Sequence, residues 1–198
     1  GKIDRLGEGI MPIFEPGLDS LVASNVKAGR LSFTTDLKGP VNAADAVFIA
    51  VGTPSSADNT HADLSYVYAA AREVADALDG YTVVVNKSTV PVGTGREVED
   101  IIRGARPEAE FDVVSNPEFL REGSAINDFM RPDRVVIGTN SDRARDVMKE
   151  MYRPLFLIET PILFTKRPTA ELIKYAANAF LATKITFINE IADLCEVV

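Results

Sequence analysis

The segment 115–124, Ser-Asn-Pro-Glu-Phe-Leu-Arg-Glu-Gly-Ser, brings two carboxylates to the end of an apolar run. Asn116 followed by Pro117 is typical of a helix start, with the cap residue before the first turn. In such a helix Glu118 and Glu122, four residues apart, share one face. Neighbouring carboxylates can differ in pKa, which suits one of them to general acid or base catalysis. The alternative is that they only complement the positive end of the helix dipole.

Two turns rich in small residues follow other apolar runs. Residues 50–55 read Ala-Val-Gly-Thr-Pro-Ser, and residues 86–95 read Asn-Lys-Ser-Thr-Val-Pro-Val-Gly-Thr-Gly. Ligands of open α/β sheets bind beyond the carboxyl ends of the strands, where amides and hydroxyls of such turns can approach a phosphate or a ribose. Each turn also has a purely structural interpretation. The first can be a chain reversal, and the second a Ser/Thr-capped helix start.

A cation and an amide lie in register on the last apolar segment. Lys174 and Asn178 are four residues apart, so a helix places both on one face. Polar side chains among apolar neighbours are costly to bury without partners, which favours a functional site over a solvated face. We assign no catalytic role to His61, which has no nucleophile arranged with it, or to Cys195, which we interpret as a small buried hydrophobe.

Short apolar runs alternate with helical patterns, which predicts an α/β fold with a parallel sheet and helices on its faces. Strands are predicted at residues 46–51, 82–86, 111–114 and 134–138, with weaker candidates at 31–34 and 162–165. Each run is apolar enough to be buried on both sides of the sheet. An amphipathic helix between the first two strands is indicated by apolar residues three and four apart, namely Leu64, Val67, Ala71, Val74 and Leu78.

The final segment, residues 168–198, contains no glycine and no proline after Pro168. It predicts one helix of about 30 residues and about 45 Å. Apolar side chains leave little of its circumference polar, so we expect it to be buried on several sides, as a spine between domains that also contacts a second copy of the chain. The alternative is an ordinary long core helix in a monomer. A domain boundary near residues 166–168 divides the chain into 1–166 and 167–198.

Composition and charge narrow the classes of function. The 198 residues carry 21 Lys and Arg against 29 Asp and Glu, a net charge of −8, without a basic cluster. Neither nucleic acid nor an anionic membrane is therefore an expected partner, and an anionic substrate must be bound locally. A single cysteine and no Cys/His cluster predict no metal site and a cytoplasmic location.

Taken in order, these motifs resemble the UDP-glucose/GDP-mannose dehydrogenase family over almost the whole chain. The resemblance begins with residues 9–18 and 29–36 and continues through 51–54, 87–94, 116–123 and 170–178. It implies an incomplete Rossmann-like sheet, doubly wound and mostly parallel, followed by a long central helix. Residues 1–166 would then be the remainder of an NAD-binding domain, and 167–198 the central helix of a dimerisation domain that makes a homodimer.

The resemblance also implies an activity. The family oxidises the C6 hydroxyl of a nucleotide-linked hexose twice, with two NAD and one water, through a cysteine thiohemiacetal and thioester. The residues that match cofactor-side positions are Lys2, Thr53, Ser55, Thr89 and Glu122. Those that match catalytic positions are Thr89, Glu118, Lys174 and Asn178. Those that match a substrate clamp are Glu118, Phe119, Leu120, Arg121 and Glu122, with Lys174 and Asn178.

The implied roles are physically consistent with the residue types. Lys174 and Asn178 can stabilise negative charge that develops on the C6 oxygen. Glu118 can act through water as a general base in thioester hydrolysis, and Thr89 can position that water. The motifs at 87–94 and 117–123 lean toward UDP-glucose as the substrate.

The chain also departs from the family pattern. We find neither the Gly-x-Gly-x-x-Gly unit that opens a complete member nor the later glycine-rich cysteine motif and UDP-binding domain, so we expect the 198 residues alone to be inactive. Two alternatives remain open. One is a GDP-mannose or UDP-N-acetylhexosamine dehydrogenase, and the other is a non-catalytic dimerisation or scaffold module derived from the family.

Overall fold

Five strands form one sheet in the order β1-β2-β3-β4-β5 in the computed structural model, which describes residues 1–56, 61–156 and 159–198. The strands are β1 Ala46–Ile49, β2 Thr82–Asn86, β3 Phe111–Ser115, β4 Val135–Gly138 and β5 Ile162–Thr165. The first three are mutually parallel, β4 pairs antiparallel with β3 through Ser115 and Gly138, and β5 is parallel to β4. The predicted α/β fold with a mostly parallel sheet is thus confirmed.

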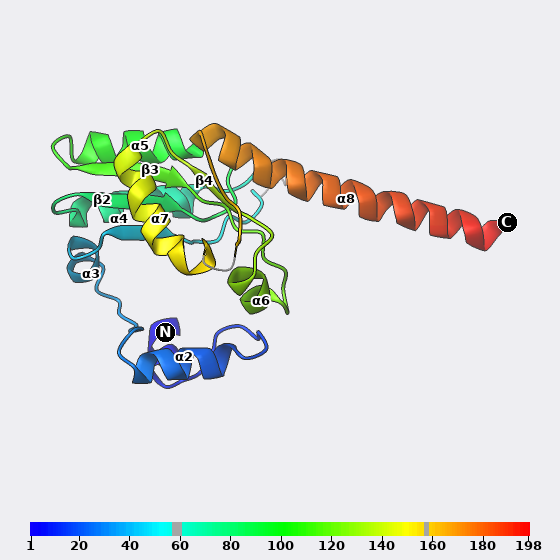
Figure 1. Ribbon diagram of the computed structural model, residues 1–198, viewed down its shortest axis with the longest axis horizontal. Helices are drawn as coiled ribbons and strands as arrows, with labels where there is room; N and C mark the ends of the chain where they lie inside the picture. Colours follow the sequence, from blue (N-terminus) through cyan, green and yellow to red (C-terminus); the bar gives the residue numbers. More distant parts are fainter. Residues whose placement is uncertain (57–60, 157–158) are drawn as a thin grey trace.

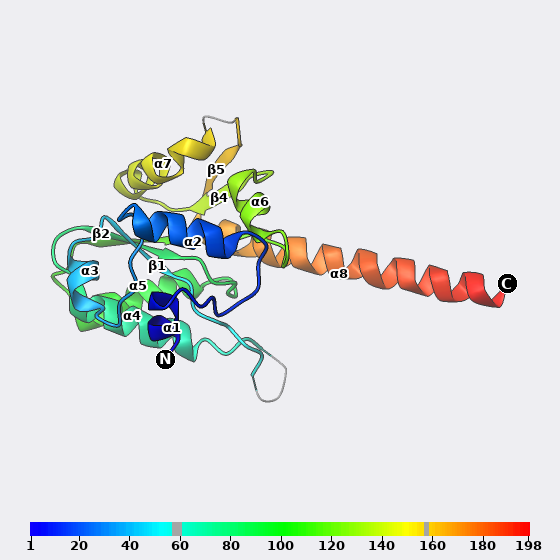
Figure 2. The same ribbon diagram turned by 90° about the horizontal axis from the view of Figure 1, so that it is seen from below.

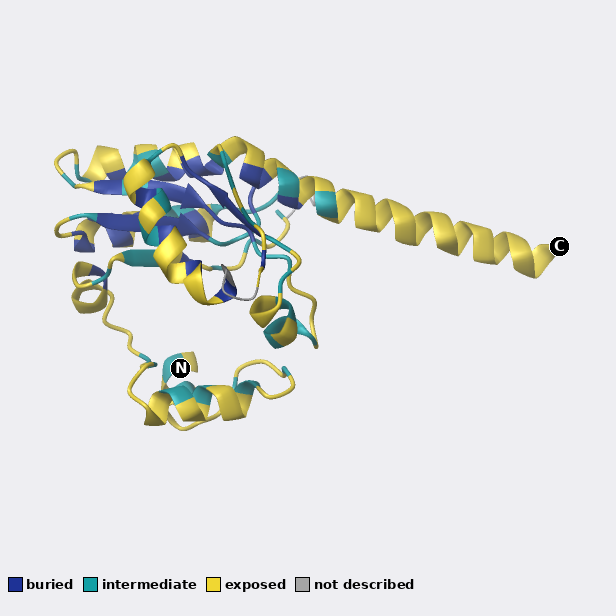
Figure 3. Cartoon of the chain, viewed as in Figure 1, coloured by how far each residue is buried: buried dark blue, intermediate teal, exposed yellow. Residues whose placement is uncertain are grey.

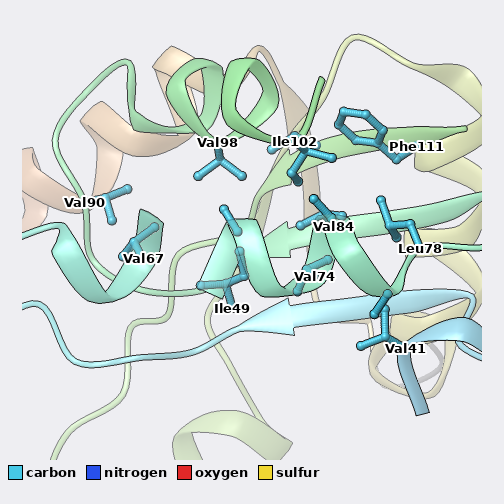
Figure 4. Close-up of a cluster of buried hydrophobic side chains, with 14 residues drawn as sticks. Val41, Ile49, Val67, Val74, Leu78, Val84, Val90, Val98, Ile102 and Phe111 are labelled. Atoms are coloured by element: carbon cyan, nitrogen blue, oxygen red, sulfur yellow. The ribbon is translucent and has the colours of Figure 1, made fainter. Parts of the chain in front are cut away.

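Helices cover both faces of this sheet (Figure 1). On one face α4 Ser65–Ala77 and α5 Thr94–Ala105 pack on β1, β2 and β3 through aliphatic side chains, including Val67, Val98 and Ile102 (Figure 4). On the other face α7 Asp142–Phe156 packs through Ala144, Met148 and further buried residues. Successive side chains of β2 alternate between the two cores, because neighbouring residues of a strand point to opposite faces. This accounts for its uninterrupted run of buried residues.

The remaining short helices are α1 Lys2–Gly7, α2 Leu18–Lys27, α3 Lys38–Asn42 and α6 Ala125–Met130. In the described chain neither α1 nor α2 contains a buried residue, and α2 lies beyond the β1 edge of the sheet (Figures 1 and 2). The carboxylate of Glu15 connects this N-terminal segment to α6, because it accepts hydrogen bonds from the amides of Gly123 and Ala125 at 2.9 and 2.7 Å.

The long helix α8 Arg167–Val197 docks on the sheet only by its first turns (Figure 3). Of its residues, all of them described, Ala170, Glu171 and Lys174 are buried, and every residue of 178–198 is exposed. The helix itself is as predicted, but its burial on several sides is not found within this chain. Exposure within these residues does not distinguish a helix that joins two copies of the chain from a core helix in a monomer, so both stay predictions. Cys195, expected to be buried, is exposed within this chain.

Two further expectations about strands are wrong. Residues 31–34 form no strand in the described chain. Burial on both sides holds for β2 and β4, whereas β1 and β5 are only partly buried because they lie at the two edges of the sheet.

Among the described residues, none of the helices combines the length and the apolar character that a membrane span requires.

The docking of α8 requires a glycine at the end of β4. A Cβ atom at Gly138 would lie 2.7 Å from the Cβ of Ala170 and 2.8 Å from the Cα of Arg167. Gly138→Ala should lower the free energy of unfolding of the full-length protein by about 1 to 3 kcal/mol, because the first turn of α8 must shift. Urea unfolding measures the change.

Gly104→Ala in α5 is the matched control, since its Cβ would meet no described atom within 4 Å. It should raise the free energy of unfolding by about 0.5 to 1 kcal/mol, because alanine restricts the unfolded chain. Equal changes in the two variants would contradict the docking argument.

Candidate active site

The turns that follow β1 and β2 are hydrogen bonded to each other at the carboxyl ends of these strands. The Ser88 hydroxyl donates to the carbonyl oxygen of Val51 at 2.7 Å, and the Thr53 hydroxyl donates to that of Thr89 at 3.0 Å. Parallel strands place their carboxyl ends at one edge, where ligands of α/β sheets bind. The structure therefore brings Thr53 and Thr89 together, as two predicted cofactor-side residues.

The segment after β3 is a loop, so the predicted helix start at Asn116 and Pro117 is wrong. The next helix, α6, begins at Ala125. Asn116 caps no helix, because its Oδ1, the atom that would cap, accepts hydrogen bonds from Lys87 and Tyr152. Its buried amide nitrogen donates to the carbonyl oxygen of Val136 at 2.8 Å. Glu118 and Glu122 consequently share no helix face, and the catalytic interpretation based on that face fails.

Tertiary contacts hold this loop in place. Besides the hydrogen bonds to Glu15, the Arg121 guanidinium pairs with Asp128 of α6 at 2.7 Å. Hydrogen bonds from the side chain and backbone of Arg121 lower the pKa of Asp128 and keep it ionised. Arg121 thus joins the loop to α6, with an exposed side chain.

Glu118 forms an ion pair with Lys174 of α8. The Lys174 Nζ lies 3.2 Å from the Glu118 Oε1, and the two side chains are 8% and 31% exposed. The same ammonium group lies 5.3 Å from the centroid of the Phe119 ring. A cation so nearly excluded from water interacts strongly with nearby charge, since few solvent dipoles screen it. The spacing of Glu118 and Lys174 along the chain gave no indication of this contact.

A buried carboxylate on the preceding turn of α8 sets the position of Lys174. Glu171 is 3% exposed and accepts hydrogen bonds from the amides of Gly93 and Gly95, at 2.7 and 2.8 Å, and from the Ser115 hydroxyl at 2.9 Å. The two amides belong to the N-terminus of α5, whose first N–H groups have no partner within the helix. Glu171 therefore caps α5 from another helix and fixes the rotation of α8 about its axis.

A pocket of about 550 Å³ opens between α6, α7, the loop after β3 and α8. The predicted site residues that line it are Glu118, Phe119, Leu120, Arg121, Lys174 and Asn178. Asn178 is exposed, so it lies at the open side. Five Lys or Arg side chains line the pocket against three Asp or Glu, which gives it a positive balance in a chain of net charge −8. An anionic ligand suits this pocket.

The other predicted site residues lie outside the pocket. Thr53 and Thr89 belong to the paired turns, and Ser55 forms an isolated bridge with Ala62. Glu122 is exposed in the loop before α6. Lys2 lies in α1, and the described residues show no hydrogen bond or ion pair between it and the other candidates. No three His, Cys, Asp or Glu side chains are grouped to hold a metal ion in the part of the chain that the structure describes.

The structure adds a polar cluster that we did not predict. The Nζ of Lys87 donates to the Asn116 Oδ1 and the Tyr152 hydroxyl oxygen, both at 3.2 Å, and all three residues line the pocket. Burial lowers the pKa of Lys87 to about 8, an effect that the negative charge of Glu118 partly offsets. Burial also raises the pKa of Tyr152 to about 12, so the phenol stays protonated. Lys87 is thus a second partly buried cation beside Lys174.

The lowered pKa of Lys87 predicts a pH dependence of stability. Below pH 8 the ammonium group is charged in the folded and unfolded states, and its burial costs stability. Between about pH 8 and 10.5 the folded protein releases this proton first, so stability rises with pH. Lys87→Met removes the ammonium group and should abolish this rise.

The expected result is that Lys87→Met, compared with the unmodified protein, loses on the order of 1 to 2 kcal/mol of relative stability between pH 7 and about pH 9.5. Urea unfolding of the full-length protein at both pH values measures it. A pH-independent difference between the two proteins would show that Lys87 titrates normally.

Comparisons with known proteins identify the family of this chain. Residues 1–156 match the NAD binding domain of the UDP-glucose/GDP-mannose dehydrogenase family, and residues 168–198 match its central domain. The chain is 70% identical to a UDP-glucose 6-dehydrogenase of Rhizobium meliloti, over 99% of this chain and 45% of that protein. The chain thus spans less than half the length of this relative.

Solved structures give the same result. A UDP-glucose dehydrogenase from Pyrobaculum islandicum superposes with a TM-score of 0.90 at 46% identity, over 96% of this chain and 44% of that one. A GDP-mannose dehydrogenase from Pseudomonas aeruginosa, solved as a ternary complex, has the same TM-score and coverage at 40% identity. With its sheet, its α8 and most of its length matched, this chain belongs to the UDP-glucose/GDP-mannose dehydrogenase family.

Proposed function

We propose that this chain works within an NAD-dependent UDP-glucose 6-dehydrogenase of the cytoplasm, which oxidises UDP-glucose to UDP-glucuronate by two hydride transfers. The observation that carries the proposal is the ion pair of the buried Lys174 with the partly buried Glu118 in a pocket of positive balance. The 70% identity to a UDP-glucose 6-dehydrogenase favours UDP-glucose over GDP-mannose or a UDP-N-acetylhexosamine. Residues 1–166 would be the NAD-binding part, and 167–198 the central helix.

The turns after β1 and β2 fit a dinucleotide. They offer hydroxyls and backbone amides at the carboxyl ends of neighbouring parallel strands, and the bonds between Thr53, Thr89, Ser88 and Val51 hold them in one arrangement. We assign Thr53, Ser55 and Thr89 to the cofactor side, with Lys2 and Glu122 as further cofactor contacts. NAD, when bound, accepts the hydride from C6 of the sugar.

Lys174 and Asn178 are the groups that we assign to the C6 oxygen. Lys174 donates one hydrogen bond to Glu118, and an ammonium group has three N–H donors, so it retains capacity for a substrate oxygen. Asn178 follows one turn later and lines the same pocket. Fixed donors aimed at developing negative charge lower the barrier because they need no reorganisation during the reaction.

Glu118 is the group that we assign to hydrolysis of the enzyme-bound thioester. Its Oε1 pairs with Lys174, and its Oε2 accepts a hydrogen bond from the amide of Leu120 at 2.5 Å, so the carboxylate is oriented from both sides. A carboxylate so placed can take a proton from an attacking water. Thr89, the proposed partner of that water, follows the pocket-lining Lys87 by two residues. Phe119, Leu120 and Arg121 form the wall that would clamp the sugar.

Replacing Lys174 tests this assignment. Lys174→Met in the full-length protein should lower kcat for UDP-glucose oxidation by about 100-fold or more, since it removes a donor to developing charge. Absorbance of NADH measures the rate, and the unmodified protein should form two NADH per UDP-glucose. Lys149→Met is the matched control. Lys149 lies exposed on α7 in a surface pair with Asp146, so kcat should not change.

Other outcomes point to other functions. Turnover of GDP-mannose or a UDP-N-acetylhexosamine without turnover of UDP-glucose would move the substrate assignment within the family. Absence of turnover with every nucleotide sugar would favour a non-catalytic scaffold module. Equal kcat values for Lys174→Met and Lys149→Met would remove Lys174 from the reaction.

We also propose that α8 joins two copies of the chain in a homodimer. Its outer part exposes apolar side chains that a monomer in water would not favour. They are Phe180, Leu181, Ile185, Phe187, Ile188, Ile191 and Leu194. An apolar helix surface of this kind suits pairing with its symmetry mate, and the contact would then be the same patch on both subunits.

Ile188→Glu tests the dimer. Ile188 is 59% exposed within this chain, so a charge costs little in the monomer but would be buried in the interface. Sedimentation of the full-length protein should show at least a tenfold weaker dimer for Ile188→Glu. Met151→Glu places the same charge on the exposed side of α7 and should leave the dimer intact. Unchanged association of Ile188→Glu would exclude this helix surface as the interface.

A further inference from the structure

The last residue of β2 is a buried amide that the proposed function does not use. Asn86 is 2% exposed, and neither its Nδ2 nor its Oδ1 has a hydrogen-bond partner among the described residues. A buried amide that loses its hydrogen bonds to water is destabilising, so such groups are normally satisfied by protein or by an ordered water molecule. The neighbouring residues show which of these applies.

A cavity of about 10 Å³ lies against Asn86. This is close to the smallest volume that holds one water molecule, which is about 10 to 15 Å³. Five of the seven residues that line it carry a polar or charged side chain, namely Asn86, Ser88, Ser115, Glu171 and Lys174. A buried water needs two to four polar partners, and these side chains are the candidates.

Glu171 and Lys174 have hydrogen-bonding capacity that the bonds around this cavity do not use. The Glu171 Oε1 accepts two hydrogen bonds, from Gly95 and Ser115, whereas Oε2 accepts one, from Gly93. A carboxylate oxygen can accept two, so Oε2 has capacity for one more donor, the fourth to this carboxylate. Lys174 has N–H groups beyond the one that it donates to Glu118. A water molecule can therefore donate to Glu171 and accept from Asn86 or Lys174.

We infer that this cavity binds one water molecule, which hydrogen bonds to the Asn86 amide and joins the end of β2 to Glu171 and Lys174 of α8. The water makes Asn86 a positioning residue for Lys174, because it connects the end of β2 to the first turns of α8. The loop after β3 holds the Lys174 ammonium group separately, through Glu118. The water site stands by itself, and the effect on Lys174 chemistry rests on the proposed function.

A crystal structure of the full-length protein tests the water site directly. At better than about 2 Å resolution, a density peak should lie within about 3.2 Å of an Asn86 amide atom and of at least one polar atom of Glu171, Lys174 or Ser115. An empty cavity, or an Asn86 side chain paired directly with a protein group, would overturn the inference.

Asn86→Leu gives an independent test through the sign of the change in Tm. Leucine fills the cavity with apolar atoms. If the Asn86 amide is paired to water, leucine removes the water from Glu171 and Lys174 and should lower Tm by about 3 °C or more. If the amide has no partner, leucine relieves its burial and raises Tm, which would count against the water. Asn86→Ser keeps a hydroxyl and space for water, and should lower Tm less than leucine does.

Kinetics of the same variants separate the water from its effect on Lys174. Asn86→Leu should lower kcat for UDP-glucose about tenfold with KM nearly unchanged, and Asn86→Ser should recover part of kcat. A water peak with kcat unchanged in Asn86→Leu would overturn the positioning role alone. A water peak in a protein that oxidises no nucleotide sugar would overturn the proposed function and leave the water site standing.

Discussion

The hydrogen bonds of the Glu171 carboxylate are the interaction on which the arrangement of the site depends. They join three elements that are remote in sequence: the start of α5, the end of β3 and the second turn of α8. The unpaired amides of α5 and its dipole both favour a negative charge at this point. A side chain at Gly95 would displace this carboxylate, since its Cβ would lie 2.8 Å from the Glu171 Oε1. With Glu171 fixed, Lys174 lies on the side of α8 that faces the loop after β3, where it pairs with Glu118.

This constraint explains how an acidic protein can present a cationic site. Lys174 is paired with Glu118 and is 8% exposed, so its charge has a partner without being placed in bulk water, while Glu171 fixes the helix that carries it. Lys87 reaches the same pocket from β2 and is held by Asn116 and Tyr152. Removing water from charges strengthens their interaction with whatever enters. The potential inside the pocket is therefore set by these nearby cations rather than by the net charge of −8 of the whole chain.

Local patterns in the sequence predicted most of the helices and strands, whereas the arrangement of the site residues depends on contacts between residues far apart in the sequence. The limits of β2 and β5 and the stripe of α4 follow from short-range periodicity and were predicted correctly. The helix start at Asn116 was predicted from cap chemistry, yet this amide is taken by Val136, Lys87 and Tyr152, up to 36 residues away. Residue type and spacing selected Glu118 and Lys174 as candidates, and the resemblance gave them catalytic roles. Their contact, and the roles of Glu171 and Asn86, depend on how the layers pack, which spacing does not encode.

The roles proposed for the two ends of α8 are separate, and the hydrogen bonds of Glu171 keep them separate. At about 1.5 Å per residue, Ile188 lies roughly 20 Å along the axis from Lys174. A force on the outer half could reach the pocket only by rotating or sliding the whole helix. Rotation would pull Glu171 from the α5 amides, and sliding would drive Ala170 into the backbone at Gly138, where no space remains. A close-packed contact of this kind resists gradual displacement. The site should therefore be insensitive to small changes at the proposed dimer contact, and coupling between them would require the Glu171 hydrogen bonds to break.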